Sequence, residues 1–83
     1  MRIYRCSNGL CNTSGRQIRA EREKCGLSQE QLAAKVQLNG LNLNQKSISR
    51  IETGERIVTD YELIQFAKAL DVTVYNLLNI REP

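Results

Sequence analysis

The chain has 83 residues, which is enough for one compact domain and too few for a separate effector domain beside it. A hydrophobic share of 41% with 25% charged residues excludes global disorder, and no apolar run approaches the roughly 18 residues of a membrane span. The net charge is +3, and the basic residues concentrate in residues 1–27 whereas residues 59–83 are net acidic. This asymmetry fits a surface that approaches polyphosphate, although a charge of this size also serves solubility alone.

Three cysteines, Cys6, Cys11 and Cys25, follow no apolar signal segment, so we expect reduced thiols in a cytoplasmic protein. The chain has no histidine, and three thiols leave a tetrahedral zinc site incomplete unless two copies share ligands. We therefore predict no metal and no cofactor. We also predict no enzymatic activity, because the sequence has no histidine base, no recognisable pair of acids and no phosphate-cradling glycine-rich loop.

Residues 1–14 show no sustained hydrophobic period and contain the turn signal Asn8-Gly9, so they predict an irregular arm. Within this arm Ile3, Tyr4 and Leu10 could pack on the domain that follows.

A first helix is predicted over residues 14–25, where the hydroxyl of Thr13 or Ser14 can cap free backbone N–H groups and Gly26 can end the helix. Its spacing places three side chains on one face, those of Ile18, Arg22 and Cys25. An arginine within an inward face needs a partner.

The second helix begins with a capping box, in which Ser28 and Gln31 each satisfy the other residue's backbone N–H. It ends near Leu38, before Asn39-Gly40. Its buried stripe consists of Leu32, Ala33 and Val36. Ala33 is small enough for a third helix to cross closely, as a helix-turn-helix requires.

The third helix is predicted from the cap Asn44 to Gly54, with Ile48 and Ile51 facing inward. Its other side is polar and carries Gln45, Lys46, Ser49 and Arg50. Glutamine can bind adenine through two hydrogen bonds, and lysine and arginine can donate to guanine. Four polar residues on a solvent face are nevertheless also what an ordinary surface helix shows.

A fourth helix starts at a second capping box, Thr59 with Glu62. Its apolar face consists of Leu63, Phe66, Ala67 and Leu70. A short fifth helix follows the cap Thr73. The predicted fold is therefore all-α, a compact five-helix bundle over residues 15–80 with a tail at 81–83.

The order of these motifs resembles the Cro/CI-type, lambda-repressor-like helix-turn-helix family. The resemblance covers residues 15–78 and rests on GLSQEQLA at 26–33, SISRIETG at 47–54 and AKALDV at 67–72, together with Ile18, Arg22, Leu63 and Leu77-Leu78. It implies a lambda-repressor-like bundle whose second and third helices form the helix-turn-helix. It also implies sequence-specific binding of double-stranded DNA by a transcriptional regulator, which we expect to be a repressor.

The resemblance also implies roles for single residues. The recognition helix, about 44–53, would enter the major groove and contact bases through Gln45, Lys46, Ser49 and Arg50. Phosphate contacts are expected from Gln29, Asn44, Ser47, Arg19 and Arg56. Arg22 and Glu52 are expected to form a structural ion pair, which gives the inward arginine its partner.

The chain departs from the family pattern at the turn of the helix-turn-helix. Seven residues, 37–43, lie between Val36 and Asn44, whereas a typical turn has about 3 or 4. We expect the second helix to gain up to a turn and Leu41 and Leu43 to enter the core, which would keep the third helix in register.

Specificity from such a small domain normally needs two copies on an inverted-repeat operator with half-sites about 34 Å apart. We expect a homodimer through the last helix, where apolar residues exceed what one side of a short helix needs, namely Val74, Leu77, Leu78 and Ile80. The alternative is a protein-interaction module of the same fold, antitoxin-like or anti-repressor-like, that holds another protein instead of DNA.

Overall fold

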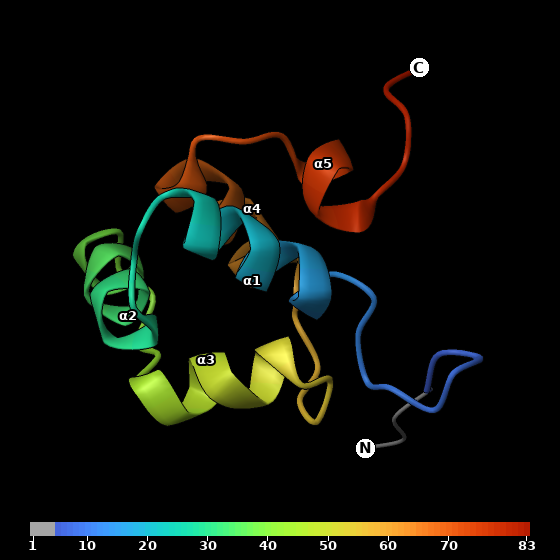
Figure 1. Cartoon of the computed structure of the whole chain (residues 1–83), viewed down its shortest axis with the longest axis horizontal. Helices are drawn as coiled ribbons and strands as arrows, with labels where there is room; N and C mark the ends of the chain where they lie inside the picture. The colour runs from blue at the N-terminus through green and yellow to red at the C-terminus, as the bar shows by residue number, and fades with distance from the viewer. Residues whose placement is uncertain (1–4) are drawn as a thin grey trace.

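The computed structural model describes residues 5–83, so the packing predicted for Ile3 and Tyr4 lies outside the described residues. Within 5–83 the chain forms five helices and no strand, which confirms the all-α five-helix prediction (Figure 1). The helices are α1 (Gly15–Lys24), α2 (Gln29–Leu38), α3 (Gln45–Glu52), α4 (Asp60–Leu70) and α5 (Val74–Leu78).

All five helices contribute to one apolar core. Seven side chains are almost completely buried, those of Ile18, Leu32, Val36, Ile48, Ile51, Phe66 and Leu77. The α2–α3 hairpin contacts α1 through α3 and α4 through α2, while α5 covers α1 and α4 (Figure 1). Burial of this set is the main source of stability available to so short a chain. Cys25, which the sequence placed on the inward face of the first helix, is instead exposed because α1 ends one residue earlier.

Most helix starts follow their sequence signals. Ser28 with Gln31 and Thr59 with Glu62 both form complete capping boxes. The side chain of Asn44 accepts from the backbone N–H of Ser47, 2.9 Å away, and caps α3. Local chemistry therefore fixes where α2, α3 and α4 begin.

The start of α1 differs from the prediction. Ser14 has a helical backbone and makes no side-chain cap hydrogen bond, so neither Thr13 nor Ser14 caps the helix as expected. Asn12 takes this role, because its Oδ1 accepts from the backbone N–H of Gly15 at 2.8 Å. The cap thus comes from further back in the arm.

The long turn between α2 and α3 follows the predicted path. α2 continues to Leu38, Gly40 adopts φ +86°, and both Leu41 and Leu43 are buried in the core. The Gln37 side chain donates to the carbonyl of Leu43 at 2.7 Å and closes the turn. Because these leucines anchor the turn, α3 keeps its register and Ile48 and Ile51 point inward.

Residues 5–14 form an ordered irregular segment, which we call the arm. A tight turn at Asn8-Gly9 is closed by hydrogen bonds between Cys6 and Leu10 and between Gly9 and Cys6. The backbone N–H of Cys11 then donates to the carbonyl of Gly54, just beyond α3. The arm is therefore attached to the C-terminal end of α3.

Candidate nucleic-acid interface

The outer face of α3 is polar and accessible. Gln45, Lys46 and Arg50 are exposed and Ser49 is half-buried, whereas Ile48 and Ile51 on the opposite side are completely buried. The side chain of Lys46 makes no hydrogen bond or ion pair with any residue of 5–83, and the side chain of Arg50 has only a 3.9 Å contact with Glu55. The structure brings the four residues expected to contact bases onto one side of one helix.

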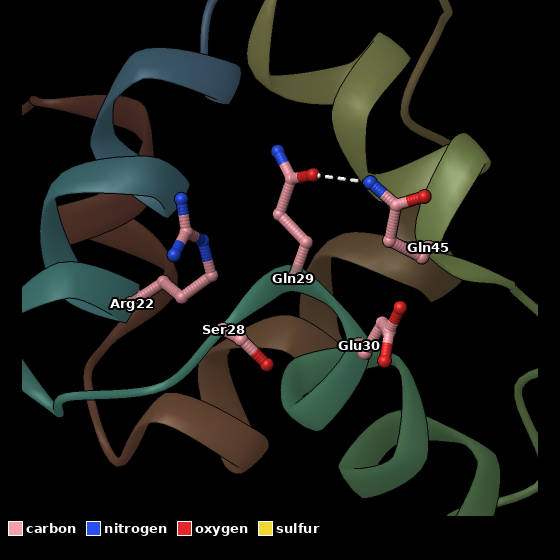
Figure 2. Close-up of a pocket in the computed structure, with 5 residues that line it drawn as sticks. All are labelled: Arg22, Ser28, Gln29, Glu30 and Gln45. Carbon is pink, nitrogen blue, oxygen red and sulfur yellow. Dashed lines mark hydrogen bonds between the residues drawn. The ribbon is translucent and has the colours of Figure 1, made fainter.

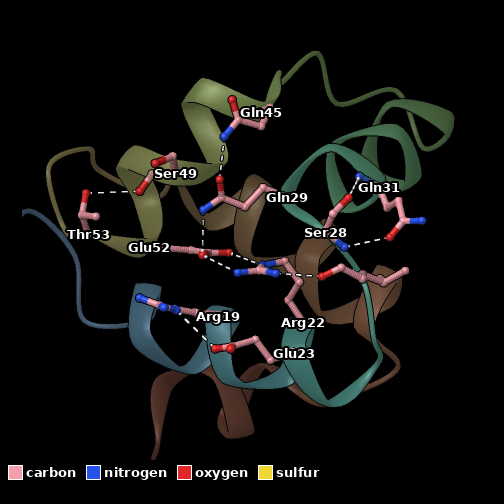
Figure 3. A network of polar contacts seen from close by, with 11 residues as sticks. Arg19, Arg22, Glu23, Ser28, Gln29, Gln31, Gln45, Ser49, Glu52 and Thr53 are labelled. Carbon is pink, nitrogen blue, oxygen red and sulfur yellow. Dashed lines mark hydrogen bonds and ion pairs between the residues drawn. The ribbon is translucent and has the colours of Figure 1, made fainter.

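Gln29 at the start of α2 connects this face to the rest of the domain. Its Oε1 accepts from Gln45 Nε2 at 2.6 Å, and its own Nε2 donates to Glu52 Oε1 at 3.1 Å (Figure 3). Each side-chain amide has two N–H groups, so both glutamines retain an unused donor, and Gln45 also retains its oxygen. The pair therefore presents polar groups outward in a fixed arrangement.

Arg22 and Glu52 form an ion pair at the centre of the same network. Arg22 Nε lies 2.7 Å from one carboxylate oxygen of Glu52 and Nη2 lies 3.0 Å from the other, so the contact is bidentate (Figure 3). Arg22 Nη1 also donates to the carbonyl of Leu27 at 2.7 Å. The hydrogen bond to Glu52 raises the pKa of Arg22 despite the opposing effect of burial. This ion pair joins α1 to α3 and supports α3 on the side opposite its polar outer face.

A hollow of about 360 Å³ opens at the N-terminal end of α2 (Figure 2). Its lining residues are Arg22, Ser28, Gln29, Glu30 and Gln45. The first backbone N–H groups of a helix have no partner within the helix, and this end carries a partial positive charge. These groups can bind a phosphate oxygen, although Glu30 adds one carboxylate to the lining and the Arg22 guanidinium is already held by Glu52 and the Leu27 carbonyl.

Asn44 caps α3 through Ser47, and this uses some of the side-chain hydrogen-bonding groups of both residues. Asn44 Oδ1 accepts both the backbone N–H and the hydroxyl of Ser47, at 2.9 and 3.1 Å. The Nδ2 donor of Asn44 stays available at an exposed position, whereas the hydroxyl proton of Ser47 is already used. Of the two, only Asn44 has a side-chain donor left for phosphate.

Arg19 and Arg56 were both expected to contact phosphate, and the structure places them differently. Arg19 is 59% exposed, with a single 3.2 Å contact to Glu23 one turn along α1. Arg56 is only 27% exposed and holds both carboxylate oxygens of Glu62, at 2.9 and 3.0 Å. The Arg19 guanidinium is therefore accessible, while that of Arg56 is already engaged within the domain.

The Arg56–Glu62 pair shifts both titrations. Burial would raise the pKa of Glu62, but hydrogen bonds from Arg56 and Thr59 outweigh it and hold that pKa below its ordinary value of 4.5. The same hydrogen bond raises the pKa of Arg56. Because the shifts favour the charged forms, the pair stabilises the loop between α3 and α4.

Two residues that position α3 were missed by the sequence analysis. Asn12 donates from Nδ2 to the carbonyls of Ile51 and Arg56, at 3.1 and 2.7 Å. Gly15 lies so close to Ile51 that a β-carbon there would overlap its carbonyl oxygen. A polar residue in an irregular segment and a glycine at the first helical position are weak signals, since their meaning depends on a distant helix end.

The surface expected to form a dimer needs one correction. Leu77 is completely buried in the core and cannot contact a second chain, because its side chain packs within this domain. Val74 and Leu78 are half-buried and Ile80 is 56% exposed. Other exposed apolar side chains of α4 and α5, which the sequence analysis did not single out, are Tyr61, Ile64 and Tyr75.

The described part of the chain holds no group of three or more His, Cys, Asp or Glu side chains arranged to bind a metal ion. Cys6, Cys11 and Cys25 are free thiols. Among residues 5–83, none of the helices has the length and apolar character needed to cross a bilayer.

Comparison with known proteins agrees with this geometry. A family model described as helix-turn-helix matches residues 18–77. The chain belongs to the Cro/CI-type helix-turn-helix family. The domain therefore belongs to the class of DNA-binding transcription regulators.

The Cro/CI-type domain is also similar to a solved structure, that of the restriction-modification controller protein C.AhdI from Aeromonas hydrophila. The two share 31% identity with a TM-score of 0.68, and the match covers 77% of this chain and 86% of the controller protein. Comparison with curated proteins gives no match.

Proposed function

We propose that the domain is a cytoplasmic, sequence-specific transcriptional repressor that reads double-stranded DNA with α3 in the major groove. The observation that carries the proposal is the outer face of α3, where Gln45, Lys46 and Arg50 are exposed beside Ser49 over a fully packed inner face. A helix presented in this way fits the major groove, where donor and acceptor patterns distinguish the base pairs.

Each residue of this face has a proposed partner. Gln45 keeps an oxygen and one N–H after bonding to Gln29, which is the donor–acceptor pair that adenine requires. Lys46 and Arg50 would donate to guanine O6 and N7, and Ser49 would contact a base one turn along the helix. Because Gln29 holds Gln45, the amide would meet the base with little loss of rotamer freedom.

Phosphate contacts would fix the register of α3 on the duplex. We propose that Gln29 and the hollow at the start of α2 take one phosphate, with Asn44 and the accessible Arg19 as further contacts. The Ser47 hydroxyl would contribute as an acceptor through water rather than as a donor. Arg56 is assigned a structural role instead, because Glu62 already binds its guanidinium.

We further propose that two copies bind an inverted repeat. The exposed Ile80 and the half-buried Val74 and Leu78 would contribute to the contact between copies. Leu77 would not, because it is buried in the core of its own domain. The similarity to a controller protein of a restriction-modification system supports a regulatory role for a domain of this size.

The alternative is a protein-interaction module of the same fold. Exposed apolar side chains on α4, α5 and just after α5 favour this alternative, because a protein partner could bury them. These side chains are Tyr61, Ile64, Tyr75 and Ile80. Such a module would hold its partner without any requirement for Lys46 or Arg50.

Fluorescence anisotropy with labelled duplexes at several salt concentrations separates these functions. If the domain binds DNA specifically, its affinity falls as the salt concentration rises. Lys46→Ala and Arg50→Ala should each reduce the free-energy preference for the specific sequence by about 1–3 kcal/mol. Lys68→Ala, which removes an exposed cation from α4, serves as the matched control and should retain the preference. Equal affinity for all duplexes in the wild type and both variants would contradict the proposal.

A further inference from the structure

A second hollow, of about 350 Å³, lies between the arm, α1 and the C-terminal end of α3. Its lining residues are Leu10, Asn12, Arg16, Arg19, Glu52, Thr53 and Gly54. This hollow is separate from the one at the start of α2, and no residue is shared between their linings. It exists only because the arm returns to the end of α3.

The available charge in this second hollow is positive. The side chain of Arg16 is exposed and makes no hydrogen bond or ion pair with any residue of 5–83, and the 3.2 Å contact of Arg19 with Glu23 uses only Nε. Glu52 is the one carboxylate of the lining, and its two oxygens are already bound by Arg22 and Gln29. Two arginines therefore line this space, Arg16 without a charge partner among residues 5–83 and Arg19 with guanidinium N–H groups left free beside its contact to Glu23.

The arm also offsets part of the negative charge that would repel an anion. The C-terminal end of a helix carries a partial negative charge on carbonyl groups that lack a partner. Here Asn12 donates to the carbonyl of Ile51, and the backbone N–H of Cys11 donates to that of Gly54. Two carbonyls at this end of α3, those of Ile51 and Gly54, are thus hydrogen-bonded by the arm beside the two arginines.

The two hollows lie on either side of the Arg22–Glu52 ion pair, since Arg22 lines the first and Glu52 the second. In Figure 3, Arg19 lies beside Glu52 on the side of the network away from Ser28. Thr53, Ser49 and Gln45 succeed one another along the visible side of α3 in the same view. Both hollows therefore border the polar face that would approach DNA.

We propose that the second hollow binds one phosphate of the DNA backbone, held jointly by Arg16 and Arg19. The inference rests on the proposed DNA binding; it adds Arg16 and the hollow beside the arm to the interface and assigns Arg16 to the same phosphate as Arg19. The ligand is a phosphate anion, which could come from the duplex or from free inorganic phosphate, and we commit to the duplex. A bidentate guanidinium contact is well matched to phosphate oxygens.

The salt dependence of binding to the selected operator duplex tests the proposal. Each neutralised phosphate contributes about 0.9 to the slope of log affinity against log salt. Arg16→Ala and Arg19→Ala should each reduce the slope by about 0.9 and the affinity by roughly threefold to tenfold, without changing the preferred sequence. The double variant Arg16→Ala/Arg19→Ala should lose no more than about 0.9, because both side chains serve one phosphate.

Lys68→Ala is the matched control and should leave the slope unchanged, and the thermal midpoints of all variants should equal that of the wild type because Arg16 and Arg19 are exposed. An unchanged slope in Arg16→Ala would overturn the proposal, as would a loss of about 1.8 in the double variant, which indicates two separate contacts. If the wild type binds no duplex at all, the proposed function itself fails.

A second measurement distinguishes the two sources of phosphate. The arginine Nε–H signals of labelled protein should shift on addition of duplex at equimolar concentration and stay unchanged with inorganic phosphate at the same concentration. Shifts produced equally by inorganic phosphate would overturn the assignment to the DNA backbone.

Discussion

The two faces of α3 differ in whether their charged side chains have partners within the domain. On the inner face Glu52 is buried, like Ile48 and Ile51, and has three side-chain hydrogen bonds, from Arg22 and Gln29. On the outer face Lys46 is exposed with no partner among residues 5–83, and Arg50 has one long contact. Within that range no buried side-chain nitrogen or oxygen lacks a hydrogen-bond partner.

This difference indicates that stability and recognition are assigned to opposite sides of one helix. Substitutions on the inner face should unfold the domain, and substitutions on the outer face should change binding alone. Gln29 is the point of contact between the two, because it bonds to Glu52 on one side and to Gln45 on the other.

The largest effect on stability is expected from Glu52→Ala. This change leaves Arg22 with a partly buried, unpaired charge, which typically costs about 3–5 kcal/mol. Chemical denaturation measures the loss. Glu52→Gln is the control that keeps the shape and part of the hydrogen bonding, and it should lose less. An unchanged unfolding midpoint in Glu52→Ala would show that the inner face does not depend on this ion pair.

A smaller loss is expected from Gly15→Ala. The added β-carbon would overlap the Ile51 carbonyl, so α1 and α3 must separate, at a cost of about 1–3 kcal/mol. Thr13→Ala, at an exposed neighbouring position, should stay within about 0.5 kcal/mol of the wild type. Equal stability of the two variants in urea would contradict the close approach of these helix ends.

The Arg56–Glu62 pair should give the domain an acid-sensitive contribution to stability. The pKa of Glu62 is lowered in the folded state, so its contribution is fully present above its ordinary value of 4.5 and is lost as pH falls through the lower folded value. The difference in unfolding free energy between the wild type and Glu62→Gln should therefore shrink below pH 4.5. A difference that is constant across this range would contradict the shift.

The smallest effect on stability is expected on the outer face. Lys46→Ala and Arg50→Ala should change the free energy of unfolding by no more than about 0.5 kcal/mol, because neither side chain supports the core. Thermal unfolding checks this. A large loss of stability in either variant would remove the distinction between the two faces.

Local sequence signals predicted most of the fold. The capping boxes at Ser28 and Thr59 fixed two helix starts, and the hydrophobic spacing placed Ile48 and Ile51 in the core. The burial of Leu41 and Leu43 followed from the length of the turn. These features are predictable because each depends on residues within a few positions of one another.

The features that could not be predicted depend on distant contacts. Asn12 caps α1 and binds the end of α3 across 39 residues, and Arg56 is engaged by Glu62 only because the loop folds back on α4. Leu77 has the same apolar character as the half-buried Val74 and Leu78, so spacing alone could not show that it is completely buried. The hollow beside Arg16 likewise arises only when arm, α1 and α3 meet.

Selection of bound duplexes from a random DNA pool tests the central claim most directly, namely that the outer face of α3 reads DNA sequence. The account predicts enrichment of an inverted repeat with half-sites about 34 Å apart, and loss of that enrichment when Lys46→Ala is selected under the same conditions. Recovery of unenriched, random sequences by the folded wild-type protein would contradict it.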